Sequence, residues 1–338
     1  MNKELMGALD ELEREKNISK ETLLDAIEQS LIQAYKNHFG KADNVHVTIN
    51  RETGDFSVYA DRRVVEFVED PAEEVSLVEA QKQNTNAEVG DILKVPVHSD
   101  KFGRIATQNA KNVILQKIRE EERKVLFDQY HGNEKEVVTG IVQRVVGHNV
   151  SVNLGKADAI LAENEQVKGE TFKPTERIKV YILEVKDTPK GPRILVSRTH
   201  PGLVKRLFES EVAEVKDGTV EIKSIAREAG SRTKLAVWSN DPDVDPVGAC
   251  VGVNGARVSA IVNELRGEKI DIINWDENPA ILIENALSPA KVIAVMADPD
   301  EKTALVVVPD YQLSLAIGKE GQNARLAARL TGFKIDIK

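Results

Sequence analysis

Two glycine-containing tetrapeptides in the C-terminal third of the chain constrain its fold more than any other feature. The first is Gly252-Val253-Asn254-Gly255 and the second is Gly318-Lys319-Glu320-Gly321. Apolar helical patterns precede and follow each one, and a glycine then ends the second helix before an alternating strand, at 269–272 and at 334–337. The copies are 66 residues apart at the glycines and 65 at the strands. We therefore interpret them as one structural unit present twice in tandem.

A G-x-x-G loop between two helices is suited to hold a nucleic-acid backbone. Glycine has no Cβ, so a sugar-phosphate chain can come close, and the N–H groups that open the second helix favour an anion. One such tetrapeptide alone is a weak signal, because it also occurs as an ordinary turn. Its repetition in register favours nucleic-acid binding over a purely structural helical hairpin. The arrangement resembles the loop of KH domains, which clamps about four nucleotides.

Each copy reads as a helix, two strands, two helices and a final strand, which is the element order of the type II KH fold. The elements before the first loop are expected at 203–208, 220–226 and 235–238, and those before the second at 280–287, 292–296 and 305–308. We predict two KH domains, at residues 201–277 and 278–338. The short segment from Trp275 to Pro279 joins them, which indicates one rigid tandem.

Residues 131–200 differ in character, with short β patterns separated by glycine and proline. Strands are expected at 137–146, 150–154, 157–161, 178–185 and 193–197. Five such strands predict a small closed barrel of the OB type, and the last of them resembles the closing strand of S1 RNA-binding domains. Such barrels usually stack bases on aromatic rings, for which His148, Phe172 and Tyr181 are the candidates. The barrel is therefore either a weak RNA contact or mainly a spacer.

The helix and strand patterns of residues 1–130 predict an α+β domain, and this region contains no recognisable chemical motif. Helices are expected at 3–16, after Ser19, near Leu77 and at 102–127, with strands at 45–49, 56–68 and 92–97. The end of the long helix is charged on all sides, which is typical of a solvated spacer. An acidic domain of this kind, attached to RNA-binding modules, indicates a protein-docking role. The predicted fold class is thus α+β and multidomain.

Charge and composition exclude several classes of protein. The net charge is −9, and residues 1–130 carry −7 of it, so RNA binding must depend on local basic residues and helix N-termini and should be salt-sensitive. No apolar run approaches the ~20 residues of a membrane span, and the N-terminus has no apolar secretion signal. The single cysteine, Cys250, excludes internal disulfides and cysteine-cluster zinc sites. We expect a cytoplasmic protein without metal or other cofactor.

Several segments resemble the NusA family of bacterial transcription elongation, pausing and termination factors. The segments 245–252, 255–258, 263–265 and 267–272 are similar to the first KH domain of that family, and Ala316–Ala327 is similar to the second. The family's order of N-terminal domain, S1 domain and two KH domains covers essentially the whole chain. The resemblance implies a monomer whose N-terminal domain docks on RNA polymerase near the RNA exit channel. It also implies binding of nascent single-stranded RNA, with effects on pausing, intrinsic termination and, with other factors, antitermination.

The loops and the resemblance together predict the RNA-contacting residues. The family often has a basic residue where this chain has Asn254, so the expected phosphate contact of the first loop moves to Arg257. The predicted set is Gly252, Val253, Asn254, Gly255 and Arg257 in the first domain, and Gly318, Lys319, Glu320, Gly321, Gln322, Asn323 and Arg325 in the second.

Enzymatic functions fit the sequence poorly. Asp241, Asp243 and Asp245 alternate like the start of a calcium loop, but Pro246 and Gly252 stand where that loop needs glycine and glutamate. A phosphorolytic exoribonuclease also carries S1 and KH modules, yet the first 130 residues are too few for its catalytic domains. We therefore predict that the chain is not an enzyme. A ribosome-associated S1/KH protein is the alternative among non-enzymes.

Overall fold

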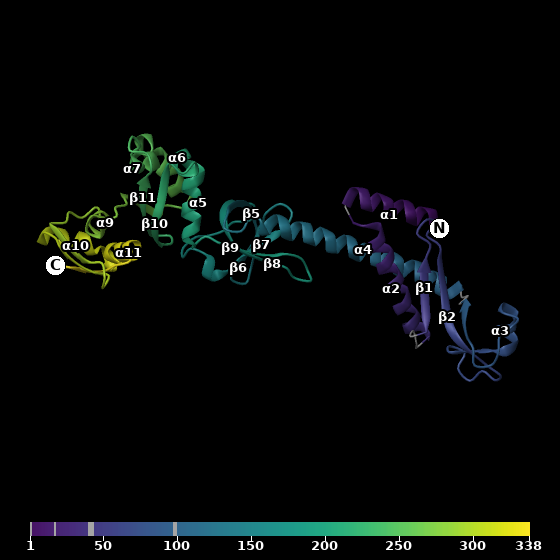
Figure 1. Ribbon diagram of the computed structural model, residues 1–338. Coiled ribbons are helices and arrows are strands. Elements are labelled where there is room, and N and C mark those ends of the chain that lie inside the picture. Colours follow the sequence, from purple (N-terminus) through teal and green to yellow (C-terminus); the bar gives the residue numbers. More distant parts are fainter. Residues whose placement is uncertain (1, 17, 40–43, 97–99) are drawn as a thin grey trace. The chain divides into compact units, whose positions relative to one another are not determined.

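The computed structural model describes residues 2–16, 18–39, 44–96 and 100–338. The chain divides into two compact units, Met1–Val125 and Leu126–Lys338 (Figure 1). None of the helices in those described ranges is long and apolar enough to cross a membrane.

The described residues of the first unit form two hydrophobic clusters. The larger one joins two helices to a strand pair, through Leu9, Leu23 and Ile27 among others, and the smaller one contains Val64 and Val75. All four strands belong to one sheet, in which the long second strand pairs with each of the other three. The elements are α1 (Asn2–Lys16), α2 (Lys20–Phe39), β1 (Val45–Ile49), β2 (Phe56–Val65), β3 (Glu74–Ser76), α3 (Leu77–Gln83), β4 (Ile92–Pro96) and the start of α4 (Asp100–His131).

Two boundaries in this region differ from the sequence prediction. The second strand ends at Val65 instead of Val68, where the alternation no longer faces a core, and Phe67 is exposed. The long helix α4 continues to His131 instead of ending at Phe127. Its residues from Leu126 onward belong to the second unit, where Tyr130 is buried and donates a hydrogen bond from its hydroxyl to the carbonyl of Leu154 at 3.1 Å.

The second unit begins with the predicted five-stranded barrel. The strands close in the order β5-β6-β7-β9-β8, and alternate side chains such as Val152, Val180 and Val196 fill the interior. The strands are β5 (Val137–Val146), β6 (Asn149–Asn153), β7 (Asp158–Leu161), β8 (Arg177–Lys186) and β9 (Arg193–Ser197).

Two α-β-β-α-α-β domains follow the barrel (Figure 1). In each three-stranded sheet the middle strand pairs antiparallel with the first strand and parallel with the last. The first domain comprises α5 (Pro201–Glu211), the short unpredicted α6 (Ala213–Lys216), β10 (Val220–Glu228), β11 (Arg232–Ser239), α7 (Pro246–Val251), α8 (Ala256–Glu264) and β12 (Lys269–Asn274). The second comprises α9 (Pro279–Ala286), β13 (Ala294–Asp298), β14 (Thr303–Val307), α10 (Asp310–Ile317), α11 (Gln322–Thr331) and β15 (Lys334–Ile337).

Neighbouring residues of β11 face two different cores. Leu235 and Val237 point into the core of the first domain, whereas Ala236 belongs to the cluster that contains the core of the second domain. This follows from the two-residue period of a strand. The second domain therefore packs its helices on the outer face of the first domain's sheet, where Ala226 and Ile273 also lie.

Candidate nucleic-acid interface

The two glycine loops have the same backbone conformation. Each joins a pair of helices, α7 to α8 in the first domain and α10 to α11 in the second. The first glycine, the third residue and the last glycine have φ/ψ of 74°/174°, 53°/26° and 73°/17° in the first loop, and 78°/170°, 54°/27° and 74°/14° in the second. The third residues, Asn254 and Glu320, are thus in the left-handed region despite carrying side chains.

The first glycine of each loop also has no space for a side chain. A Cβ at Gly252 would lie 2.8 Å from Cγ of Arg257, and one at Gly318 would lie 2.7 Å from the backbone nitrogen of Asn323. Positive φ and this close packing both require glycine at the two positions.

Arg257 and Asn323 occupy equivalent places, two residues after the last glycine of their loops, and both bond back to the preceding helix. Arg257 donates from Nη1 to the carbonyl of Ala249 at 2.7 Å and to Glu214 at 2.9 Å. Asn323 donates from Nδ2 to the carbonyls of Ala316 and Leu287, each at 3.0 Å. These two side chains act as latches that close the helix pair.

The latch geometry changes the expectation for both residues. Only 1% of Asn323 is exposed, so its side chain does not face a ligand, and its contribution to the loop is structural. The guanidinium of Arg257 is half-buried and engaged by its two acceptors, so it is not a free cation beside the loop. Sequence reasoning missed this because the two latches are different residue types.

The second helix of each pair begins without a side-chain cap. The N-cap residues are Gly255 for α8 and Gly321 for α11, and neither supplies an acceptor to the first turn. The unpaired N–H groups of a helix start carry partial positive charge. An anion such as a phosphate can satisfy them.

The exposed residues at the loop tips differ between the domains. Val253 is 83% exposed in the first loop, and Lys319 and Glu320 are exposed in the second. The second loop therefore offers a cation at its tip, whereas the first offers an apolar side chain.

Gln322 and Arg325 face the first KH domain. Gln322 donates from Nε2 to Glu228 and to the Ser231 hydroxyl, both at 2.8 Å, and Arg325 donates from Nε to Glu228 at 2.8 Å. The hydrogen bond with Arg325, followed by that with Gln322, lowers the pKa of Glu228, so this carboxylate is ionised at neutral pH.

Helix α10 presents an apolar surface beside the second loop that the sequence reading did not identify. Tyr311 is 78% exposed, and Leu315, one turn later, is also exposed, as is Ile317 next to the first glycine. The four-residue spacing of Tyr311 and Leu315 places them on one face of the helix, and the buried Ala316 lies on a different face. That spacing was the available signal, but an apolar pair at this spacing is also typical of a core.

The barrel uses its candidate aromatic residues internally or at its junction with the first KH domain. Tyr181 is buried and stacks on His200 with ring centroids 4.6 Å apart, and Phe172 lies under the guanidinium of Arg266 at 5.3 Å. Of the three candidates, only His148 has a largely exposed side chain.

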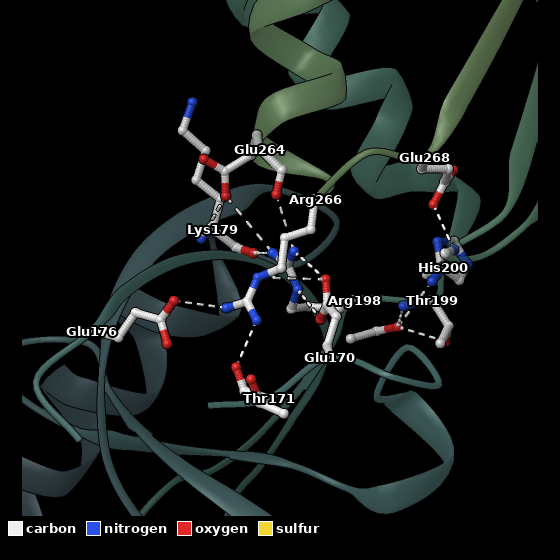
Figure 2. A network of polar contacts seen from close by, with 12 residues as sticks. Glu170, Thr171, Glu176, Lys179, Arg198, Thr199, His200, Glu264, Arg266 and Glu268 are labelled. Atoms are coloured by element: carbon white, nitrogen blue, oxygen red, sulfur yellow. Dashed lines mark hydrogen bonds and ion pairs between the residues drawn. The ribbon is translucent and has the colours of Figure 1, made fainter. Parts of the chain in front are cut away.

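A network of buried charges fixes that junction (Figure 2). Arg198, which follows the last barrel strand, donates to both carboxylate oxygens of Glu170 at 2.7 and 2.6 Å and to the carbonyl of Glu264 in α8 at 3.1 Å. Arg227 forms a second bidentate pair with Glu268, with both distances at 2.9 Å, and also donates to the carbonyl of His200. Paired and hydrogen-bonded charges of this kind tolerate burial only in one geometry, so the barrel and the first KH domain form one body.

Four family models match the chain in succession. They describe the NusA N-terminal domain at residues 4–124, the S1 RNA binding domain at 132–197, the NusA-like first KH domain at 198–275 and the NusA-like second KH domain at 279–338. The transcription termination/antitermination protein NusA of Bacillus subtilis is 56% identical over 338 residues, which are 100% of this chain and 91% of that protein. The chain belongs to the NusA family.

Other NusA proteins are similar along the same length. That of Halalkalibacterium halodurans is 55% identical over 100% of this chain and 88% of its own, and that of Thermus thermophilus is 42% identical over 99% and 89%. These matches confirm the predicted resemblance to the NusA family and the predicted α+β multidomain fold with an S1 barrel and two KH domains. They also confirm that the chain belongs to a family of transcription factors and not of enzymes. As a NusA protein with S1 and KH domains, the chain is an RNA-binding transcription factor.

Proposed function

We propose that the two KH loops hold nascent single-stranded RNA while residues 1–130 dock on RNA polymerase near the RNA exit channel. Holding both partners would let the protein prolong pauses, favour intrinsic termination and take part in antitermination complexes with other factors. We further propose that it acts as a monomer in the cytoplasm. The observation that carries the proposal is the pair of loops with matching backbone dihedrals, each opening onto an uncapped helix.

In this proposal each loop binds RNA through its backbone. A phosphate lies against the first turn of α8 or α11, close to the glycines, and Lys319 adds a cation in the second domain. Bases lie on the apolar residues beside the second loop, where Tyr311 offers a ring for stacking. Of the residues predicted from the sequence, Gly252, Val253, Asn254, Gly255, Gly318, Lys319, Glu320 and Gly321 remain proposed contacts.

The remaining domains have supporting roles. The barrel, whose aromatic residues are mostly engaged, serves mainly to hold the KH domains at a fixed position relative to itself. The division into residues 1–130, 131–200, 201–277 and 278–338 separates polymerase docking from RNA binding. The acidic N-terminal domain is suited to a partner surface that is basic.

Binding of a fluorescently labelled single-stranded RNA to the full chain tests the RNA site. The double variant Gly318→Asp and Gly321→Asp places negative charge against the backbone of the RNA and should lose affinity. Thermal unfolding and circular dichroism check that the variant is folded. A folded double variant with unchanged affinity would show that the second loop is not the site.

Capture of partners from a bacterial lysate tests the docking half. Residues 1–130, immobilised, should retain RNA polymerase, and residues 131–338 should retain RNA. Retention of ribosomes instead of polymerase by the N-terminal fragment would favour a ribosome-associated function.

A further inference from the structure

The second KH domain is held on the first by contacts at both ends of a shared apolar surface. Near the linker, Asn285 donates to the carbonyl of Asn274 at 3.1 Å, and on the middle strand buried Lys234 donates to the carbonyl of Ser288 at 2.8 Å. At the other end of the sheet, the β10–β11 hairpin reaches the start of α11 through Glu228. Ala226, Ala236 and Ile273 form the apolar surface of the first domain.

Glu228 lies at the last residue pair of that hairpin, opposite Arg232. One carboxylate oxygen accepts from Gln322 and the other from Arg325, the first and fourth residues of α11, and Arg329 lies 3.9 Å away. Arg325 also donates from Nη1 to the carbonyl of Glu320 at 2.8 Å. A continuous chain of hydrogen bonds therefore runs from Glu228 through Arg325 to the third residue of the second loop.

We propose that Glu228 is a positioning residue for RNA binding: it fixes the second G-x-x-G loop relative to the first, so that one RNA can engage both. The inference rests on the proposed RNA-binding function of the two loops. Glu228 itself does not contact RNA. Its carboxylate would repel a phosphate chain near α11, so its presence there is unfavourable for RNA binding unless the geometry that it imposes outweighs the repulsion.

The physical advantage lies in the entropy of the second contact. When two sites are held at a fixed separation, binding at one places the RNA at the other, and little freedom remains to be lost. A rim contact can add to the control of this separation even where an apolar core holds the domains together, because part of the first domain's apolar surface is made by small side chains. Ala226 and Ala236 offer little side chain to resist a rotation of one domain on the other.

Comparing the affinities for RNAs of two lengths separates a positioning effect from the effect of removing a negative charge. Two single-stranded RNAs, of about four and about ten nucleotides, are measured against the full chain at one salt concentration. The variants are Glu228→Ala and, as a matched control, Glu221→Ala, which removes the same charge from the same strand. Glu221 pairs with Lys223 and Asn240 within the first domain. Because Glu228→Ala also removes the repulsion near α11, it should bind short RNA at least as tightly as Glu221→Ala.

The ratio of long-RNA to short-RNA affinity should fall by roughly threefold to tenfold in Glu228→Ala and stay at the wild-type value in Glu221→Ala. Glu228→Gln has the same shape and can still accept from Arg325, so it should keep most of the ratio. A Glu228→Ala ratio equal to that of the control would overturn the proposal.

Amide hydrogen exchange without RNA gives an independent test. Residues 318–325 should exchange faster in Glu228→Ala than in Glu221→Ala, because the start of α11 loses two of its side-chain anchors. Equal exchange in the two variants would also overturn the positioning role. If the wild-type protein binds neither RNA, the proposed function fails, while the exchange result still decides whether Glu228 positions the loop.

Discussion

Arg257 in the first KH domain and Asn323 in the second perform the same task with different chemistry. Each lies under the first glycine of its loop and donates to a carbonyl of the preceding helix, Ala249 at 2.7 Å and Ala316 at 3.0 Å. The long arginine reaches this carbonyl from an intermediate position, whereas the short asparagine must be buried to do so. The shared geometry makes the loop a rigid element in both domains.

The latch role of Arg257 predicts that Arg257→Met lowers stability without weakening the salt dependence of RNA binding. Methionine keeps the apolar contact with Gly252 but loses the hydrogen bonds, so the free energy of unfolding should fall by about 1 kcal/mol. The slope of log affinity against log salt concentration should not change. Lys319→Ala is the contrasting variant, because loss of a phosphate contact on single-stranded RNA should flatten that slope by about 0.7. A similar flattening in Arg257→Met would identify Arg257 as a phosphate ligand instead.

Glu320 has a left-handed backbone, with φ 54°, which disfavours glutamate more than asparagine. The equivalent residue of the first loop is Asn254, with φ 53°. Glu320→Asn should therefore raise the free energy of unfolding by about 0.5 kcal/mol, measured by urea denaturation. Glu301→Asn, in the exposed turn between β13 and β14, is the control and should change stability less. A destabilised Glu320→Asn protein would show that the glutamate side chain makes a contact that outweighs its backbone cost.

The Arg227–Glu268 pair predicts how stability depends on pH. Burial by itself raises the pKa of Glu268, but the hydrogen bonds and charge from Arg227 outweigh it, so the pKa is lowered in the folded protein. A lowered pKa means that the pair stabilises the fold above the unfolded-state pKa of about 4.3 and that this contribution is lost as pH falls below it. Urea midpoints should be flat near neutral pH and decline below about pH 4.

Glu268→Gln tests the origin of that decline. It leaves Arg227 buried without a counter-charge, so the variant should lose about 3 kcal/mol at pH 7. Its stability should then depend less on pH between 5 and 3 than that of the wild type. An unchanged acid profile would assign the decline to other carboxylates, such as Asp271, whose pKa is also lowered, by its contacts with Arg232 and Lys234 against the opposing effect of burial.

Much of the fold followed from local patterns. The barrel strands and both α-β-β-α-α-β units matched their predicted positions closely, because periodicity and glycine stops act within a few residues. The helix α4 was predicted too short because the charged residues before Tyr130 leave no apolar periodicity there. The partner of Tyr130, Leu154, is distant in sequence. The exposed Tyr311 and Leu315 were also missed, since spacing alone cannot tell a core face from a binding face.

Side-chain roles at the site depended on contacts that a sequence does not reveal. Arg257 and Arg325 are both arginines that follow a glycine loop, yet one is bonded to the preceding helix and the other to Glu228, from a different domain. These partners lie 8 and 97 residues away. The positive charge of both arginines predicted an RNA contact for each, but the acceptors nearby in the fold determine which group each guanidinium binds.

The linker between the KH domains provides a last prediction. From the sequence we predicted a rigid linker because of Trp275 and Pro279. In the structure Trp275 packs edge-on against Trp238, and Pro279 begins α9. The domains, however, also share an apolar core and polar contacts at both of its ends, so the linker is not all that holds them. Inserting ten Gly/Ser residues after Glu277 should therefore reduce the affinity for a long RNA by less than about threefold, because the interface still brings the loops together. The same insertion combined with Glu228→Ala should reduce it further than either change alone, without loss of short-RNA affinity. A large loss from the insertion alone would mean that the linker, and not the interface, sets the distance between the loops.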